Sequence, residues 1–296
     1  MGNIESIKRQ IKTAEDLFSV VKNMKMLAAV SIRQYEEAVK SLDDFNRATE
    51  MGFNTLLRLR PEALTLLRPE PAHRLGAVIF GSDQGMCGQL NDQIFSHAWE
   101  AMDNLGFPLG KRLLMAVGLR IAERLEAAGE TVEKYLPVPG SVEGVTPKVL
   151  EVLTDIGRWH EELHINRIVL IFQKHLSSGS YLPQTLPLWP VDSLVLENFR
   201  RIPWSTRSLP TFTMDWRRLF QALIRQHLFG SLYRAFAESL ASEHASRLTS
   251  MQGAEKNIET RLAELNAQFH QMRQMSITEE LLDIVSGFTA LTEKER

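Results

Sequence analysis

The stretch that decides the fold is the last long segment of the chain, residues 215–291, whose central part reads IETRLAELNAQFHQM at residues 258–272. No proline follows Pro210. Proline interrupts helices because it lacks a backbone donor and clashes with the preceding turn. The segment is therefore predicted to form a single helix of roughly 110 Å, at about 1.5 Å per residue. Such a helix is longer than a compact domain is wide, so we expect most of it to pack against a partner.

Apolar residues in this segment recur at alternating spacings of four and three, which is the pattern of a coiled-coil seam. The first set comprises Ile258, Leu262, Leu265, Phe269 and Met272. The second set, one position out of phase, comprises Ile277, Leu281, Ile284, Phe288 and Leu291. The slip between the sets rotates the stripe by about 100°, given about 3.6 residues per turn. We therefore expect the end of the helix to face different neighbours.

The first 60 residues carry a second stripe of the same kind. They lack proline, and no glycine occurs between Asn3 and Met51. The stripe comprises Ile7, Ile11, Ala14, Phe18, Val21, Lys25, Ala28, Ile32, Tyr35, Val39 and Leu42. Two interpretations of Lys25, its single charged member, remain open. Either its stem lies along the seam while the ammonium reaches water, or it contacts an acidic partner.

The segment between the two helices has a different period, typical of an α/β domain. Strands are expected at residues 75–80, 112–117 and 167–172, with a further strand at 186–196 and an edge strand at 132–136. Helices are expected at residues 91–105, 119–128 and 147–163. Alternating strands and helices favour an open, largely parallel, Rossmann-like sheet.

The predicted fold class is thus α/β plus coiled coil, in which the N- and C-terminal helices form an antiparallel two-helix coiled coil around the inserted domain. The expected divisions are residues 1–60, 72–202 and 211–291. Composition agrees with a soluble globular chain, at 296 residues, 44% hydrophobic and 24% charged. The net charge of −2 gives no pull toward nucleic acid. With no apolar run near a membrane span and no signal or transit peptide indicated, we expect a cytosolic chain.

Three residues match the zincin pattern H-E-x-x-H: His160, Glu161 and His164. Two histidines one helical turn apart can bind zinc, with the intervening glutamate as general base. The alternative is a pair of surface histidines at the end of an amphipathic helix, and this interpretation is favoured because the pattern falls at the last predicted turn.

The segment GSDQGMCG, residues 81–88, follows a predicted strand and precedes a helix, a place that can bind phosphate through helix N-terminal amides. Its spacing matches no nucleotide-binding motif, and Asp83 would repel a phosphate. A structural turn is therefore favoured. Cys87, the single cysteine, excludes an internal disulfide and has no evident partner for nucleophilic catalysis. We expect it to be a small buried residue.

Several segments in order along the chain resemble the gamma subunit of F-type ATP synthases. They are IKRQIK at 7–12, MKMLAA at 24–29, GSDQGMCGQLN at 81–91, LYRAFAESLASEH at 232–244, RQMSITEE at 273–280 and DIVSG at 283–287. Together they span nearly the whole chain. The sequence departs from the family pattern at Gln84, Gln89 and Glu279, and at Val30, Ser31, Gln34 and Tyr35.

The resemblance implies a rotor shaft without catalytic, cofactor-binding or metal-binding residues. Its coiled coil would stand inside a ring of alpha and beta subunits. Its α/β domain would lie near the epsilon subunit and the membrane c-ring, on the cytoplasmic face of the bacterial inner membrane. Met24 and Lys25 would contact a beta subunit, and Arg273, Gln274 and Thr278 would contact the ring's catch region. Two other functions stay open: a zinc-dependent hydrolase and a helical scaffold without a rotary role.

Overall fold

The computed structural model describes residues 4–67, 71–176, 180–204 and 210–294, with side chains as far as residue 286. The chain divides into two compact units, and each is described by itself. The coiled-coil unit consists of Met1–Leu27 and Leu248–Arg296. The α/β unit consists of Ala28–Arg247.

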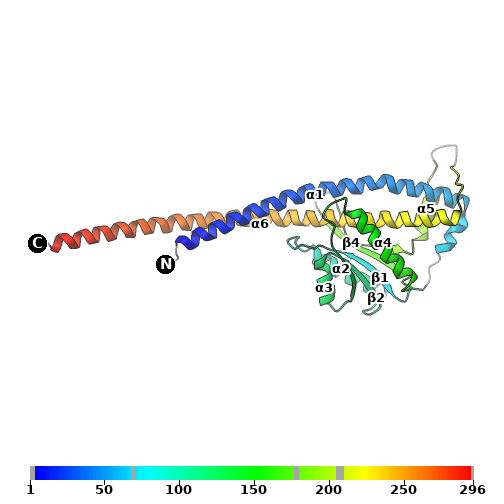
Figure 1. Ribbon diagram of the computed structural model, residues 1–296, viewed down its shortest axis with the longest axis horizontal. Helices are drawn as coiled ribbons and strands as arrows, with labels where there is room; N and C mark the ends of the chain where they lie inside the picture. Colours follow the sequence, from blue (N-terminus) through cyan, green and yellow to red (C-terminus); the bar gives the residue numbers. More distant parts are fainter. Residues whose placement is uncertain (1–3, 68–70, 177–179, 205–209, 295–296) are drawn as a thin grey trace. The chain divides into compact units, whose positions relative to one another are not determined.

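Two long helices carry the fold, as the stripes predict (Figure 1). Helix α1 spans Ile4–Leu59 and helix α6 spans Trp216–Lys294. The side chain of Asp215 accepts hydrogen bonds of 3.1 Å from the backbone N–H groups of Arg217 and Arg218. It thereby satisfies donors that the first turn of α6 leaves unpaired. Helix α1 stops before a short 3₁₀ helix, η1, at Pro61–Leu67, because the residue before a proline avoids helical geometry.

In the coiled-coil unit the two helices run antiparallel. The ammonium of Lys8 lies 5.7 Å from the ring centroid of Phe269, and Lys25 forms an ion pair with Glu255. Numbers rise along α1 as they fall along α6, which fixes the direction. Every member of the predicted seam from Ile258 to Met272 is buried or half-buried. This part of the prediction is confirmed.

The α/β unit contains one five-stranded sheet, in the order β3-β2-β1-β4-β5. Its strands are β1 Leu75–Phe80, β2 Arg112–Val117, β3 Val132–Leu136, β4 Arg167–His175 and β5 Tyr181–Trp189. Strand β1 pairs parallel with β2 and with β4, and β2 pairs parallel with β3, whereas β5 pairs antiparallel with β4. The predicted largely parallel sheet, with 132–136 at its edge, is therefore confirmed.

Helices cover both faces of this sheet. Helices α2 (Leu90–Asn104) and α3 (Leu119–Ala127) pack on one face through a core that includes Ile94, Ile121 and Val169. Helix α4 (Val145–Glu161) and part of α6 pack on the other face, together with Tyr35 of α1. Alternate residues of each strand point to opposite faces, so the continuous apolar strands serve both cores.

A third core joins the end of α1 to the start of α6. It includes Phe53 and Leu56 of α1, Leu67 of η1 and Phe220 of α6. One to two turns away from this core, Phe45 of α1 meets Phe229 of α6 edge-on, with ring centroids 5.7 Å apart. A Cβ atom at Gly230 would stand 2.6 Å from the amide oxygen of Asn46. Glycine at this position therefore lets the two helices approach closely.

One predicted element is wrong in part. Residues 186–196 were expected to form a strand, but β5 ends at Trp189 and helix α5 occupies Ser193–Arg201. The Asp192 side chain accepts a hydrogen bond of 2.8 Å from the backbone N–H of Leu194, and so caps α5. This local capping outweighs the apolar pattern, because a satisfied N-cap stabilises a helix start by about 1 kcal/mol. The division of the chain at 1–60, 72–202 and 211–291 stays a prediction.

Candidate functional site

The first place to look for a ligand site is the carboxyl end of the sheet between β1 and β4. There the strand order reverses, because β2 and β3 lie to one side of β1 while β4 and β5 lie to the other. Doubly wound proteins bind their ligands in the crevice at this switch point. In this chain the crevice is bordered by the 81–88 loop, which follows β1.

Asp83 occupies the position that an anion would take. Its carboxylate accepts hydrogen bonds of 2.8 Å from the N–H of Leu119, from the N–H of Val138 and from the hydroxyl of Tyr135. Leu119 is the first residue of α3, so the carboxylate sits at the positive end of that helix dipole. Asp83 thus caps α3, the helix that follows β2, and this role supports the interpretation of the loop as a structural turn.

The rest of the loop is held by Asn91. Its side-chain oxygen accepts from the N–H of Ser82 at 3.1 Å, and its amide donates to the Ser82 hydroxyl at 2.8 Å. Cys87 is buried, with its sulfur 3.4 Å from the Asn91 amide nitrogen. The prediction that Cys87 is a small buried residue is confirmed. A thiol held by neutral groups in this way has no base to activate it.

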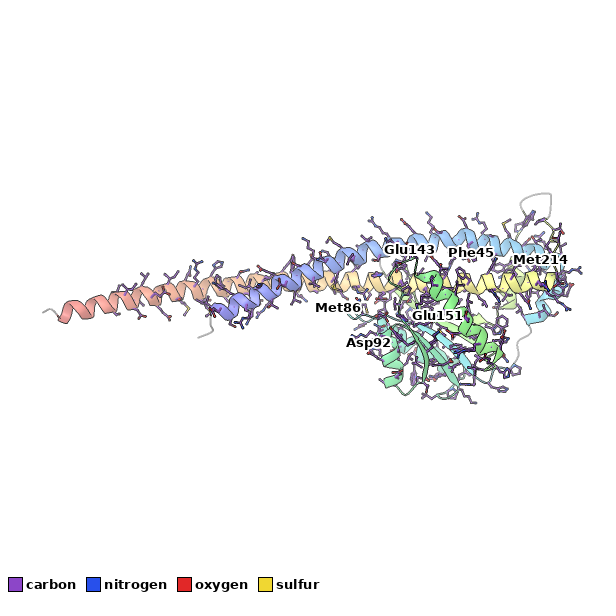
Figure 2. All side chains as sticks on the ribbon, viewed as in Figure 1. Phe45, Met86, Asp92, Glu143, Glu151 and Met214 are labelled. Carbon is purple, nitrogen blue, oxygen red and sulfur yellow. The ribbon has the colours of Figure 1, made fainter. Side chains whose placement is uncertain are left out.

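A hollow of about 360 Å³ opens beside the loop and is lined by Met86, Asp92 and Arg124, among others. Met86 and Asp92 lie at the same end of the α/β domain (Figure 2). Arg124 is paired with Asp92, and Arg120 with Glu123 at 3.2 Å. Because both arginines are already neutralised by carboxylates, the hollow offers no net positive charge to an anionic ligand.

Helix α6 covers the crevice on the face of the sheet against which α4 also packs. The Ser246 hydroxyl donates to the carbonyl of Cys87 at 2.5 Å, and the Ser242 hydroxyl lies 3.1 Å from the carbonyl of Gln173. Gln173, near the end of β4, is fully buried and donates its side-chain amide to the carbonyl of Leu90 at 3.3 Å. The space in which a nucleotide would bind is therefore filled by the chain's own helix.

Buried charges of α6 lie next to these serines. Glu243 pairs with Arg247 at 2.6 Å, and both side chains are buried. Burial raises the pKa of Glu243, although the neighbouring arginine acts in the opposite direction. Burial, together with Arg247, lowers the pKa of His244 to about 4. The His244 ring stacks on Tyr35 with ring centroids 5.7 Å apart, so these groups contribute to the packing of α6 against α1.

The zincin interpretation is wrong for a geometric reason. Helix α4 ends at Glu161, and His164 lies beyond it with a backbone φ of 52°. The two histidines therefore do not project from one face of a helix, as the motif requires. His160 instead packs edge-on to Trp189, with ring centroids 5.3 Å apart. Within the described residues, no group of three or more His, Cys, Asp or Glu is placed to hold a metal ion.

The five residues predicted to contact other subunits all lie in the coiled-coil unit. Met24 and Lys25 are half-buried, and Lys25 pairs with Glu255 of the same chain. Arg273, Gln274 and Thr278 are exposed on α6. From the level of Lys25 to that of Arg273 is about 27 Å along the helix, at about 1.5 Å per residue. The structure therefore places these residues in two separate groups.

Exposed apolar residues gather near both groups. Beyond the seam, Ile277, Leu281 and Ile284 are 48%, 58% and 68% exposed. The predicted change of face after Met272 is thus accompanied by loss of any partner within the described chain. On α1, Leu17, Val20 and Leu27 are also exposed. The sequence analysis missed this second stripe, although its successive spacings of three and seven residues place all three on one helix face.

Comparison with known proteins bears on this arrangement. A family described as ATP synthase matches residues 3–291. A similar sequence, named ATP synthase gamma chain, occurs in Synechococcus sp. (strain PCC 6716), at 27% identity over 98% of this chain and 100% of the relative. Another, with the same name, occurs in Buchnera aphidicola subsp. Diuraphis noxia, at 23% identity over 99% of each chain.

The chain belongs to the gamma-subunit family of F-type ATP synthases. The fold of this gamma subunit is also that of a solved rotor from the Euglena gracilis mitochondrial ATP synthase, with a TM-score of 0.63 at 14% identity. That match covers 93% of this chain and 99% of the other.

Membership of this family implies a non-catalytic component of the complex. In the described ranges, no helix is both long and apolar enough to cross a bilayer.

Proposed function

We propose that this chain is the central rotor shaft that couples ion flow through the membrane sector to ATP synthesis or hydrolysis at the beta subunits. The observation that carries the proposal is the exposed apolar end of α6, from Met275 to Val285, on a helix whose preceding seam is covered by α1. Monomeric proteins rarely leave such a surface in water. A ring of alpha and beta subunits around this end would cover it.

The shaft works without chemistry of its own. Its orientation biases the conformational equilibrium of each beta subunit, because its faces make different contacts with the three of them. A ligand or partner shifts an equilibrium only by its differential affinity for the two states. The catalytic residues for the nucleotide accordingly belong to the beta subunits.

Two groups of residues are proposed to make these contacts. Met24 and Lys25 face an acidic loop of a beta subunit, and Arg273, Gln274 and Thr278 face the catch region of the ring. Lys25 is half-buried beside Glu255. An acidic loop would therefore compete with an intrachain ion pair, which at such partly exposed positions contributes only about 0.2–1 kcal/mol. This low cost of exchange supports a contact that forms and breaks as the shaft turns.

The remaining partners are the epsilon subunit and the c-ring, which we place at the α/β domain. The complex would lie on the cytoplasmic face of the bacterial inner membrane, with this chain attached only through its partners. Support comes from the bacterial relatives named ATP synthase gamma chain and from a solved assembly of Euglena gracilis that contains a c-ring.

The test is reconstitution of the full-length chain with the alpha and beta subunits of the same source. We expect co-assembly and stimulation of ATP hydrolysis. A variant that lacks residues 275–296 should assemble or couple less well, because the exposed apolar end is lost. The matched control is a substitution of Leu59, an exposed apolar residue at the end of α1, which leaves the end of α6 intact. If the full-length chain neither assembles with the ring nor stimulates it, the alternative of a helical scaffold without a rotary role replaces this proposal.

A further inference from the structure

The contact between α6 and the carboxyl end of the sheet is more specific than packing requires. Ser246 connects three elements of the α/β unit. Its hydroxyl donates to the carbonyl of Cys87 in the 81–88 loop at 2.5 Å, and lies 3.1 Å from the hydroxyl of Tyr181 on β5. With Tyr181 donating to Ser246, the two hydroxyls form one continuous chain of hydrogen bonds from β5 through α6 to the loop.

Ser246 is buried, and its hydroxyl lies among polar groups. One turn earlier, Ser242 is fully buried and lies against the carbonyl of Gln173 on β4. Because Ser242 also lies 2.7 Å from the carbonyl of Glu238 on its own helix, its single hydrogen is shared. Of the two serines, Ser246 is therefore the one whose hydroxyl hydrogen bonds to β5 and to the 81–88 loop and not to α6 itself.

A buried polar group that loses its hydrogen-bond partner has few other groups to which it can bond. Burying a polar atom without a hydrogen bond costs more than the bond itself contributes, about 1–3 kcal/mol. The carbonyl of Cys87 would lose its donor from α6 if the helix moved away. A sheet face held only by apolar contacts can slide, since hydrophobic contact is non-directional. A buried hydroxyl chain is directional and fixes the register of helix and sheet.

We infer that Ser246 is a positioning residue for rotary coupling: through Tyr181 and Cys87 it locks the sheet of the α/β domain to α6, so that both turn as one body. The inference rests on the proposed function, in which the α/β domain lies at the c-ring. Torque between the c-ring and the shaft then passes across this junction. We call Tyr181, Ser246 and Cys87 together the α6 lock.

The test uses the reconstituted complex, including the membrane sector, with Ser246→Ala and, separately, Tyr181→Phe. Tyr181→Phe loses one hydrogen bond, worth about 1 kcal/mol, and the local opening of the junction should become about 5-fold more frequent. Ser246→Ala loses two hydrogen bonds and should raise the opening frequency by at least as much. Amide hydrogen exchange in the 81–88 loop reports this opening. We expect ATP hydrolysis to stay at the wild-type rate while ATP-driven ion pumping per ATP falls.

Ser239→Ala is the matched control, because Ser239 is equally buried on α6 but forms no hydrogen bond to the sheet within the described residues. It should leave both exchange and pumping unchanged. Ser246→Thr keeps the hydroxyl and should restore pumping toward the wild-type ratio. Because the hydrogen bond of Tyr181 ends on Ser246, the double variant should lose little more than Ser246→Ala alone.

Two results would overturn the inference. In one, Ser246→Ala exchanges and pumps like Ser239→Ala, so the lock does not hold the junction. In the other, exchange accelerates but pumping per ATP is unchanged, so the lock is structural and carries no torque. Failure of the proposed function looks different, since the wild-type chain itself would then not stimulate hydrolysis.

Discussion

Two segments of the same helix, α6, meet opposite environments. From Ala235 to Arg247 every side chain is buried except His244, which is half-buried. From Met275 to Val285 every side chain except Ser276 is exposed, although this segment includes Ile277, Leu281 and Ile284. The two segments show that burial follows from the neighbours a helix meets, and apolar content alone does not decide it.

The neighbours differ for a simple reason. The first segment lies against the sheet, with Phe236 meeting Phe80 edge-on at 4.8 Å and Tyr35 of α1 completing the core. The second segment has no such cover within the described chain. The described part of helix α1 begins at Ile4, and near this end Lys8 lies against Phe269. Among the described residues, no second helix packs along Ile277, Leu281 and Ile284, which are exposed.

The largest expected effect compares one large apolar residue from each segment. Phe236→Ala removes a buried ring and leaves a cavity, so the free energy of unfolding should fall by about 3–5 kcal/mol. Leu281→Ala, at an exposed position, should change it by less than about 0.5 kcal/mol. Chemical denaturation of the purified full-length chain measures both. Similar losses for the two variants would mean that the end of α6 is covered within this chain.

A smaller effect concerns pH. The pKa of His244 is lowered from 6.5 to about 4 in the folded chain. Between these values the unfolded chain binds a proton that the folded chain does not, so stability falls as the pH is lowered from 6.5 toward 4. The loss contributed by this group amounts to about 3 kcal/mol.

His244→Gln removes this titration while a polar side chain remains. The variant should lose less stability than the wild type between pH 6.5 and 4, as measured by denaturation at several pH values. Glu243, whose raised pKa acts with the opposite sign, is present in both proteins, so the difference isolates His244. Parallel curves would show that His244 is protonated as readily in the folded chain as in the unfolded one.

The smallest effect compares two glycines of α6. A Cβ atom at Gly253 would meet nothing within 4 Å, so Gly253→Ala should stabilise the helix by up to about 1 kcal/mol. Gly230→Ala should gain less, because its Cβ atom would stand 2.6 Å from the oxygen of Asn46. Thermal unfolding should show a rise of up to about 2 °C for Gly253→Ala. An equal rise for Gly230→Ala would mean that Asn46 moves aside without cost.

Local patterns predicted the elements that are long or strongly periodic. The seam of α1 and α6 and the apolar strands β1, β2 and β4 lie where the sequence indicates, because their spacing follows from helix and strand geometry. Helix α5 was missed because residues 186–196 were taken as one apolar strand, although the Asp192 cap starts a new helix at Ser193. For the H-E-x-x-H pattern the sequence analysis favoured two surface histidines at a helix end, and this agrees with the exposed His160 and His164 and with the end of α4 at Glu161.

The sequence by itself determined the two long helices, the α/β insert and, through its resemblance to a family, the role of a rotor shaft. These follow from spacing and from the order of segments along one chain. Only the tertiary structure decided that Asp83 caps α3, that Lys25 pairs with Glu255, and that Ser246 joins α6 to the sheet. Such contacts join residues far apart in sequence, and no local spacing encodes which distant donor will meet which acceptor once the cores are packed.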